Sequence, residues 1–102
     1  MHVTKIIRPY LLVALFLSVF ATACVSAPVQ EMSDARQALQ AAEEVGADRE
    51  ATDRYDAAVD LLRRAEEALN RGDYNRAREQ ALAAKAAALA AREQAVNRAP
   101  NP

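Results

Sequence analysis

The sequence predicts an all-α protein, a short antiparallel helical bundle made of a helical hairpin and one preceding helix. Three segments after residue 30 each carry apolar residues in a heptad pattern, which is typical of packed helices. The two glycines of the chain, Gly46 and Gly72, separate these segments. Residues 24–102 include 22 alanines, and alanine is the strongest helix former.

The first helix is expected from Pro28 to about Val45. Proline suits the first position of a helix because its fixed φ is helical and its missing N–H is not needed there. Glu31 and Asp34 place negative charge near the positive end of the helix dipole. Gly46 supplies the residue that ends the helix.

The second helix is expected to start with a cap from Thr52 or Asp53 and to continue to about Asn70. Both side chains are of the type that accepts a hydrogen bond from the first free N–H groups of a helix. Gly72 follows the last helical residues and marks the end.

The third helix is expected from the cap Asp73 to about Asn97, so that Gly72, Asp73 and Tyr74 form the turn of the hairpin. Residues 99–102, Ala-Pro-Asn-Pro, are predicted to be a disordered tail, because proline cannot continue a helix. We assign the helical domain to residues 31–98.

The three helices share one heptad frame, which predicts the faces that pack together. Their seam residues are Met32, Ala35, Leu39 and Ala42; then Tyr55, Ala58, Leu62 and Ala65; and then Tyr74, Ala77, Ala81, Ala84, Ala88, Ala91 and Ala95. Pairing the second helix with the third sets Leu62 opposite Ala81 and Tyr55 opposite Ala88, so that large side chains meet small ones.

A second apolar row runs along the third helix at Leu82, Leu89 and Val96, which we call the apolar stripe. It lies roughly 130° from the seam, so it cannot face the second helix together with the seam. Beside it, Arg78, Lys85 and Arg92 form what we call the basic row. Two interpretations are open. Either the first helix covers the stripe or leucine is there simply as a good helix former, or else the stripe serves self-association or an envelope protein partner. The shorter first helix is expected to leave the Val96 end uncovered.

Charge is distributed unevenly along the chain. Residues 28–73 carry 12 acidic and 6 basic side chains, whereas residues 74–98 carry 2 acidic and 5 basic ones. This asymmetry predicts that the two parts pair with each other. The hairpin frame places Glu66 across from Arg78.

Composition excludes several classes of function. The single histidine, His2, lies in the N-terminal segment, and the single cysteine is Cys24, so the sequence offers no zinc site and no His-activated nucleophile. With two glycines there is no phosphate-binding loop. We therefore expect no enzyme activity, no cofactor, no metal and no small-molecule substrate. The net negative charge of residues 24–102 also argues against nucleic-acid binding.

The N-terminal segment has the three parts of a secretory signal peptide, predicted over residues 1–23. Lys5 and Arg8 form a basic start, an apolar run follows, and residues 21–23, Ala-Thr-Ala, form a small-residue exit. The run is shorter than the roughly 20 residues that span a bilayer. Cleavage is expected between Ala23 and Cys24.

Small residues before a cysteine resemble the lipobox of bacterial lipoproteins. This resemblance implies that Cys24 becomes the acylated N-terminus, with residues 24–30 as the lipidated tether to the membrane. Val25 after the cysteine implies sorting to the outer membrane. Residues 21–23 also fit an ordinary secretory signal, which would cut the same bond and leave a free thiol in an oxidising compartment.

The segment 69–77, Leu-Asn-Arg-Gly-Asp-Tyr-Asn-Arg-Ala, adds a second resemblance. Together with the signal and the Ala-rich first helix, it is similar to a family of small bacterial lipoproteins that carry a helical domain of unknown function and are sometimes linked to OmpA-like domains. The resemblance implies a non-catalytic structural or protein-interaction module in the cell envelope, at the outer membrane and facing the periplasm.

Two alternatives share parts of this pattern. The Gly-Asp-Tyr step resembles the start of a tetratricopeptide helix, which would imply a peptide-binding adaptor, but Tyr55 and Tyr74 are 19 residues apart and no repeat of 34 residues occurs. An alanine-seamed lipoprotein also resembles a murein-lipoprotein spacer, although that family forms one long helix and here Gly46 and Gly72 interrupt it.

Overall fold

The computed structural model describes residues 10–12 and 26–98. Residues 10–12 are helical, but the rest of the expected signal peptide, the cleavage site at Ala23 and Cys24, and the tail at 99–102 lie outside the described residues. The described elements of the domain are α2 (Val29–Glu44), α3 (Ala47–Glu50), α4 (Thr52–Asn70) and α5 (Tyr74–Arg98).

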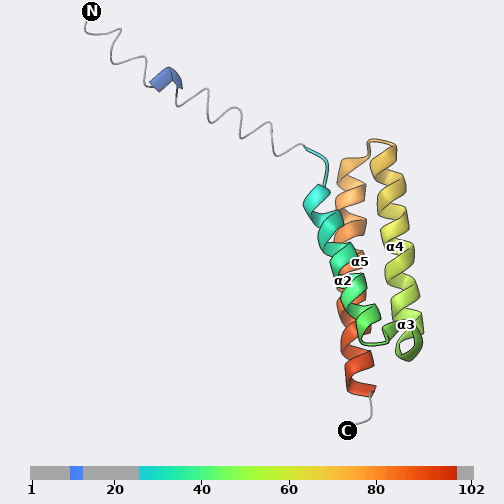
Figure 1. Ribbon diagram of the computed structural model, residues 1–102. Coiled ribbons are helices and arrows are strands. Elements are labelled where there is room, and N and C mark those ends of the chain that lie inside the picture. Colours follow the sequence, from blue (N-terminus) through green and yellow to red (C-terminus); the bar gives the residue numbers. More distant parts are fainter. Residues whose placement is uncertain (1–9, 13–25, 99–102) are drawn as a thin grey trace, which may run out of the picture.

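The helices form an elongated antiparallel bundle (Figure 1). α2 runs from one end to the other, the short α3 turns the chain, and α4 and α5 form the hairpin. α5 packs against both α4 and α2, whereas α2 and α4 contact each other less. The prediction of an all-α bundle, a hairpin with one preceding helix, is confirmed. The bounds of the three long helices agree with the expected ones to within about one residue.

The core is built on the predicted seams and consists mainly of alanine. α5 contributes six fully buried alanines: Ala77, Ala81, Ala84, Ala88, Ala91 and Ala95. Leu62 packs in a cluster with Ala81, and Tyr55 packs in a cluster with Ala88, as the pairing of large with small side chains predicts. Met32 of α2 is the largest fully buried side chain in this core. Tyr74, the expected start of a seam, is instead exposed at the end of the bundle.

The hairpin turn satisfies the free backbone groups at the end of α4. Gly72 has φ +78°, the left-handed conformation that favours glycine. Its N–H donates to the carbonyl of Leu69, and the N–H of Asp73 donates to the carbonyl of Ala68, a pattern known as the Schellman motif. The Oδ1 atom of Asp73 then accepts a hydrogen bond from the backbone N–H of Arg76 at 3.4 Å, so Asp73 caps α5 as predicted.

The junction between α2 and α4 differs from the expectation. Gly46, with φ +79°, ends α2 as predicted, but the chain then forms the short helix α3, which was not predicted from the sequence. Thr52 does not cap α4: its hydroxyl donates to the carbonyls of Asp48 and Arg49, because α3 lies directly before it. Ala51 precedes the first residue of α4, and no side chain caps this helix start. The extra turn buries Ala47 and Ala51 against the far end of α5.

The expected pair between Glu66 and Arg78 is wrong. Glu66 accepts instead from Arg36 of α2 at 3.2 Å, and the Nε of Arg78 donates to Glu31 of α2 at 3.3 Å. The reason is that α2 lies along the groove between α4 and α5. A side chain on α4 such as Glu66, or on α5 such as Arg78, therefore reaches α2 before it reaches the other helix of the hairpin. The predicted pairing of acidic and basic parts holds between α2 and α5, where Lys85 also meets Asp34 at 3.9 Å.

The turn gives a stability prediction. A Cβ added at Gly72 would have no atom within 4 Å, so a substitution there tests the backbone conformation alone. We expect Gly72→Val to lower the free energy of unfolding by more than about 1 kcal/mol, because a β-branched residue is strained at positive φ. Gly72→Asn is the matched control and should cost less, since asparagine tolerates this conformation. Thermal melts in which both variants equal the wild type would contradict this account of the turn.

Candidate functional site

The apolar stripe lies on the outer face of α5, away from the core. Leu82, Leu89 and Val96 are 52%, 49% and 50% exposed. They are spaced by seven residues, so they follow one line about 21 Å long. α2 therefore leaves this row about half exposed over its whole length, including the part near Leu82 where α2 runs alongside.

The basic row marks the side of the stripe on which α2 lies. Arg78 and Lys85 reach across to Glu31 and Asp34 of α2, as described above. Arg92, one heptad further on, is exposed. The basic row thus forms the boundary between α2 and the apolar stripe, and its first two members help to hold α2 in place.

The other side of the stripe carries acidic residues that the sequence analysis did not single out. Glu79 and Glu93 directly follow Arg78 and Arg92 in the chain, and both are exposed. At 100° per residue they lie roughly 60° from the stripe, whereas the basic row lies roughly 40° from it on the opposite side. We call Glu79 and Glu93 the acidic edge. The signal was present in the sequence as a spacing of 14 residues, two heptads, with Ala86 at the position between them.

The turn residues Gly72, Asp73 and Tyr74 lie at the end of the bundle where the described chain enters α2 (Figure 1). Here the carbonyl of Ser26 accepts from Arg78 at 3.1 Å, and Pro28 is fully buried. Ser26, which precedes α2, is therefore held against the start of α5. α3 and the last turn of α5 lie at the opposite end, where Arg98 donates to the carbonyl of Glu50 at 2.9 Å.

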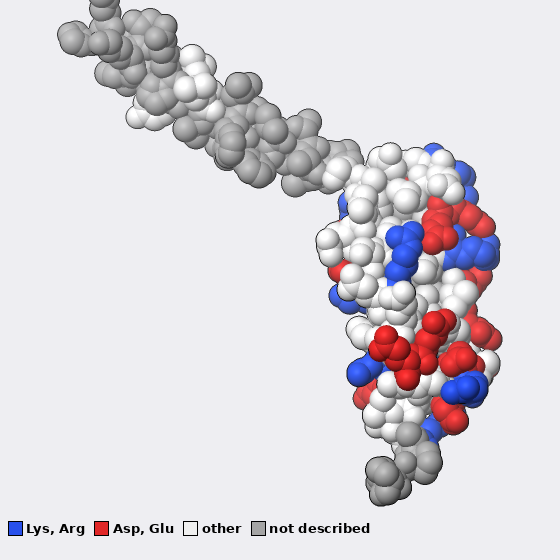
Figure 2. Space-filling view, in the orientation of Figure 1, with Lys and Arg blue, Asp and Glu red and all other residues white. Residues whose placement is uncertain are grey.

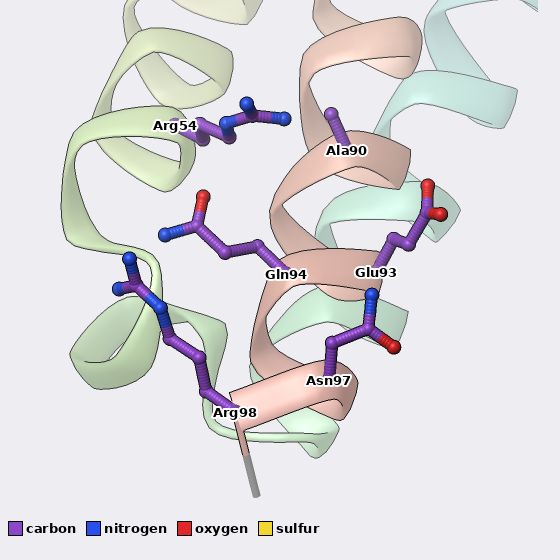
Figure 3. A pocket seen from close by; sticks show the side chains of 6 residues that line it. All are labelled: Arg54, Ala90, Glu93, Gln94, Asn97 and Arg98. Atoms are coloured by element: carbon purple, nitrogen blue, oxygen red, sulfur yellow. The ribbon is translucent and has the colours of Figure 1, made fainter.

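An open hollow of about 600 Å³ lies between α4 and the last turns of α5 (Figure 3). Arg54 from α4 and Gln94 and Arg98 from α5 reach into it, whereas Glu93 and Asn97 point away from the gap between the helices. The three inward side chains are all long, polar and open to water. The hollow has the character of a solvated surface between two helices, without the apolar lining that is typical of small-molecule sites.

Carboxylates gather on the half of the molecule toward α3 in the view of Figure 2. Residues 43–56, from the end of α2 to the start of α4, carry six acidic and two basic side chains. Within residues 10–12 and 26–98, no group of three or more potential ligands is arranged to hold a metal ion. The gathering is therefore an acidic surface at the end of the bundle opposite the entry of the chain.

One tyrosine in this acidic half has a strongly shifted pKa. The hydroxyl of Tyr55 donates to Glu43 at the joint of α2 and α4. This hydrogen bond, together with burial and the nearby charges of Glu43, Asp48 and Asp56, raises the pKa of Tyr55 to about 12. The bond holds α2 to α4 next to the place where Tyr55 packs on Ala88.

Comparisons with protein-family models, with curated proteins and with solved structures found no match to this chain. The resemblance to Ala-rich lipoproteins therefore stays a prediction. Among the described helices, none is long and apolar enough to cross a membrane.

The Tyr55–Glu43 bond gives a pH prediction. The folded-state pKa of Tyr55 is raised from 10.0 to about 12, so the stability that the bond contributes is fully present below about pH 10 and is lost as the pH rises through about 12. We expect Glu43→Gln to lower the pKa of Tyr55 toward 10, because it removes the carboxylate that accepts the hydrogen bond of the hydroxyl and, with it, the negative charge that opposes tyrosinate.

Ultraviolet absorbance of tyrosinate, followed against pH, measures this shift. Glu44→Gln is the matched control, since Glu44 is the exposed neighbour of Glu43 and does not bond to Tyr55. A Glu43→Gln titration curve that overlays the wild type would show that the hydroxyl does not donate to Glu43.

Proposed function

We propose that this chain is a lipoprotein of the bacterial cell envelope, anchored through acylated Cys24 in the outer membrane and facing the periplasm. Its helical bundle acts as a non-catalytic protein-interaction module, and the apolar stripe on α5 is the interaction surface. The observation that carries this proposal is the fixed position of Ser26 at the start of α5, combined with the lipobox-like residues 21–24 directly before it.

The short distance from anchor to bundle follows from this contact. Ser26 is bonded to Arg78, and Cys24 precedes Ser26 by two residues, a reach of at most about 7 Å. An acyl group on Cys24 would therefore hold the Gly72 end of the bundle close to the lipid surface. The acidic end with α3 would point away from the membrane.

The exposed side chains at the Gly72 end fit such a position. Tyr74 and Val29 are both exposed there. Tyrosine is enriched at membrane–water interfaces because its ring is apolar and its hydroxyl is polar. Arg71 and Arg76, also exposed, could meet lipid phosphates. These residue types support a membrane-proximal role for this end.

The same orientation sets the apolar stripe at a defined height. α5 has 25 residues and rises by about 1.5 Å per residue. Leu82 and Val96 therefore lie about 12 and 33 Å beyond the first residue of α5 along its axis. A stripe held in this way on a short tether faces sideways, parallel to the membrane, where other envelope proteins are found.

Replacement of Cys24 tests the anchor. We expect Cys24→Ser to release the protein from the membrane fraction or to leave it as an uncleaved precursor, because a serine cannot carry the thioether-linked lipid that holds it. Ser26→Ala is the matched control: it changes a nearby side chain and keeps both the cysteine and the backbone carbonyl that Arg78 contacts.

Two readouts decide the matter: membrane fractionation of both variants, and metabolic labelling with an alkyne fatty acid. The wild type and Ser26→Ala should both be labelled and sediment with membranes. A wild type that stays unlabelled while a known lipoprotein in the same cells is labelled would overturn the proposed anchor.

A further inference from the structure

We infer that the partner of the apolar stripe is a second copy of this chain, packed α5 against α5 in parallel around a two-fold axis. The observation behind this inference is the charge pattern on the two sides of the stripe: the basic row on one side and the acidic edge on the other. The inference deepens the proposed function by naming the partner, and it rests on that function for the membrane tether that brings the two copies together.

Symmetry decides between the two ways of pairing identical helices. In a parallel pair the two-fold axis runs along the helices, so the flank on one side of the stripe in one copy faces the flank on the other side of the stripe in the second copy, at the same height. The basic row of one copy then faces the acidic edge of its partner. In an antiparallel two-fold pair, like flanks face each other, so the basic row would meet itself.

The register supports the parallel arrangement residue by residue. Arg78 is followed directly by Glu79, and Arg92 directly by Glu93, so the members of each pair differ in height by about 1.5 Å. In the parallel pair, Arg92 of one copy meets Glu93 of the other, and the two-fold axis repeats this contact. Arg78 already donates to Glu31 and to the carbonyl of Ser26 in its own copy, so the Glu79 end contributes less to the pairing than Arg92 and Glu93 do. Lys85 lies opposite the small Ala86.

The position of α2 is compatible with this pairing. α2 lies beyond the basic row, bound to it through Glu31 and Asp34, and so occupies one flank of each stripe only. The two-fold axis places the two α2 helices on opposite sides of the α5 pair. The face of α5 that carries Glu79, Ala86 and Glu93 is exposed and can receive the partner.

Three half-exposed apolar side chains form a small contact. Stable interfaces bury roughly 800 Å² per partner, so a single helix edge of this kind is expected to associate weakly in dilute solution. Membrane tethering changes this because it restricts both copies to one plane and raises their effective concentration. A parallel pair also has both chains entering at the same end, as two copies anchored in one membrane require.

Single cysteines on the stripe test the arrangement in the full-length chain in intact cells, with oxidative cross-linking as the readout. In a parallel pair each stripe residue faces its own copy, so Leu82→Cys, Leu89→Cys and Val96→Cys should all give disulfide-linked dimers. In an antiparallel pair centred on Leu89, only Leu89 faces its own copy, and Leu82 faces Val96. Leu89→Cys would then cross-link by itself, whereas Leu82→Cys and Val96→Cys would cross-link only with each other, when both variants are expressed together. Ala57→Cys, on the exposed face of α4, is the control for random collision, and the wild type controls for Cys24.

We expect Leu82→Cys and Val96→Cys each to form disulfide-linked dimers in a yield well above that of Ala57→Cys. Cross-linking of Leu89→Cys without the other two, or of none of the three, would overturn the parallel pair; the second outcome would point to a different envelope protein on the stripe. Fractionation of the same cells reports the anchor separately, so loss of the dimer and loss of the anchor are distinguished.

Charge reversal in the Val96→Cys background gives an independent test. Arg92→Glu or Glu93→Arg alone should weaken association by about tenfold, because each turns two symmetric attractive pairs into repulsive ones. The double variant Arg92→Glu, Glu93→Arg restores opposite charges across the axis and should restore cross-linking. Glu44→Lys, a reversal on the exposed end of α2, should have no effect. Failure of the double variant to recover, with its helicity intact, would count against the pairing.

Discussion

The close approach of α2 and α4 to one row of alanines on α5 is the constraint on which the rest of the structure depends. Because each side chain of this row ends at a single methyl group, both neighbouring helices can lie on the same helix, and the bulk of the core comes from Met32, Leu39, Tyr55 and Leu62 on the other side. The bundle is thin for the same reason. It buries little apolar area per residue, so the caps, turns and ion pairs at its joints matter more than in a larger domain.

Much of this architecture could be predicted from the sequence because the local signals agree with one another. The heptad frame identifies the buried alanines of α5, and the glycines identify both turns, since only glycine takes positive φ without strain. Asp73 caps α5 as its chemistry suggests. Where the structure differs from the predicted helices, the cause is a contact between elements that lie far apart in the sequence. α3 forms because Ala47 and Ala51 find a buried place against Ala91 and Ala95, a contact that no local pattern reveals.

The candidate surface shows the same division. The stripe and the basic row follow from helical spacing. The expected Glu66–Arg78 pair was wrong because it considered α4 and α5 alone, whereas α2 lies between the two side chains and pairs with each of them. The contact of Ser26 with Arg78 could not be predicted either, since it joins residues 52 positions apart. That contact relates the proposed function to the fold, because Ser26, the hairpin turn and the start of the stripe all lie at the first turns of α5.

The measurement that tests the central claim most directly is the free energy of unfolding of Ala88→Leu compared with Ala83→Leu. Both add the same side chain to the same helix, but Ala88 is fully buried in the row and Ala83 is exposed. If the close approach of the helices holds the bundle together, Ala88→Leu should lose about 1 to 3 kcal/mol through overpacking, and Ala83→Leu should stay within about 0.5 kcal/mol of the wild type. Equal stability of the two variants would contradict the claim that the alanine row sets the packing.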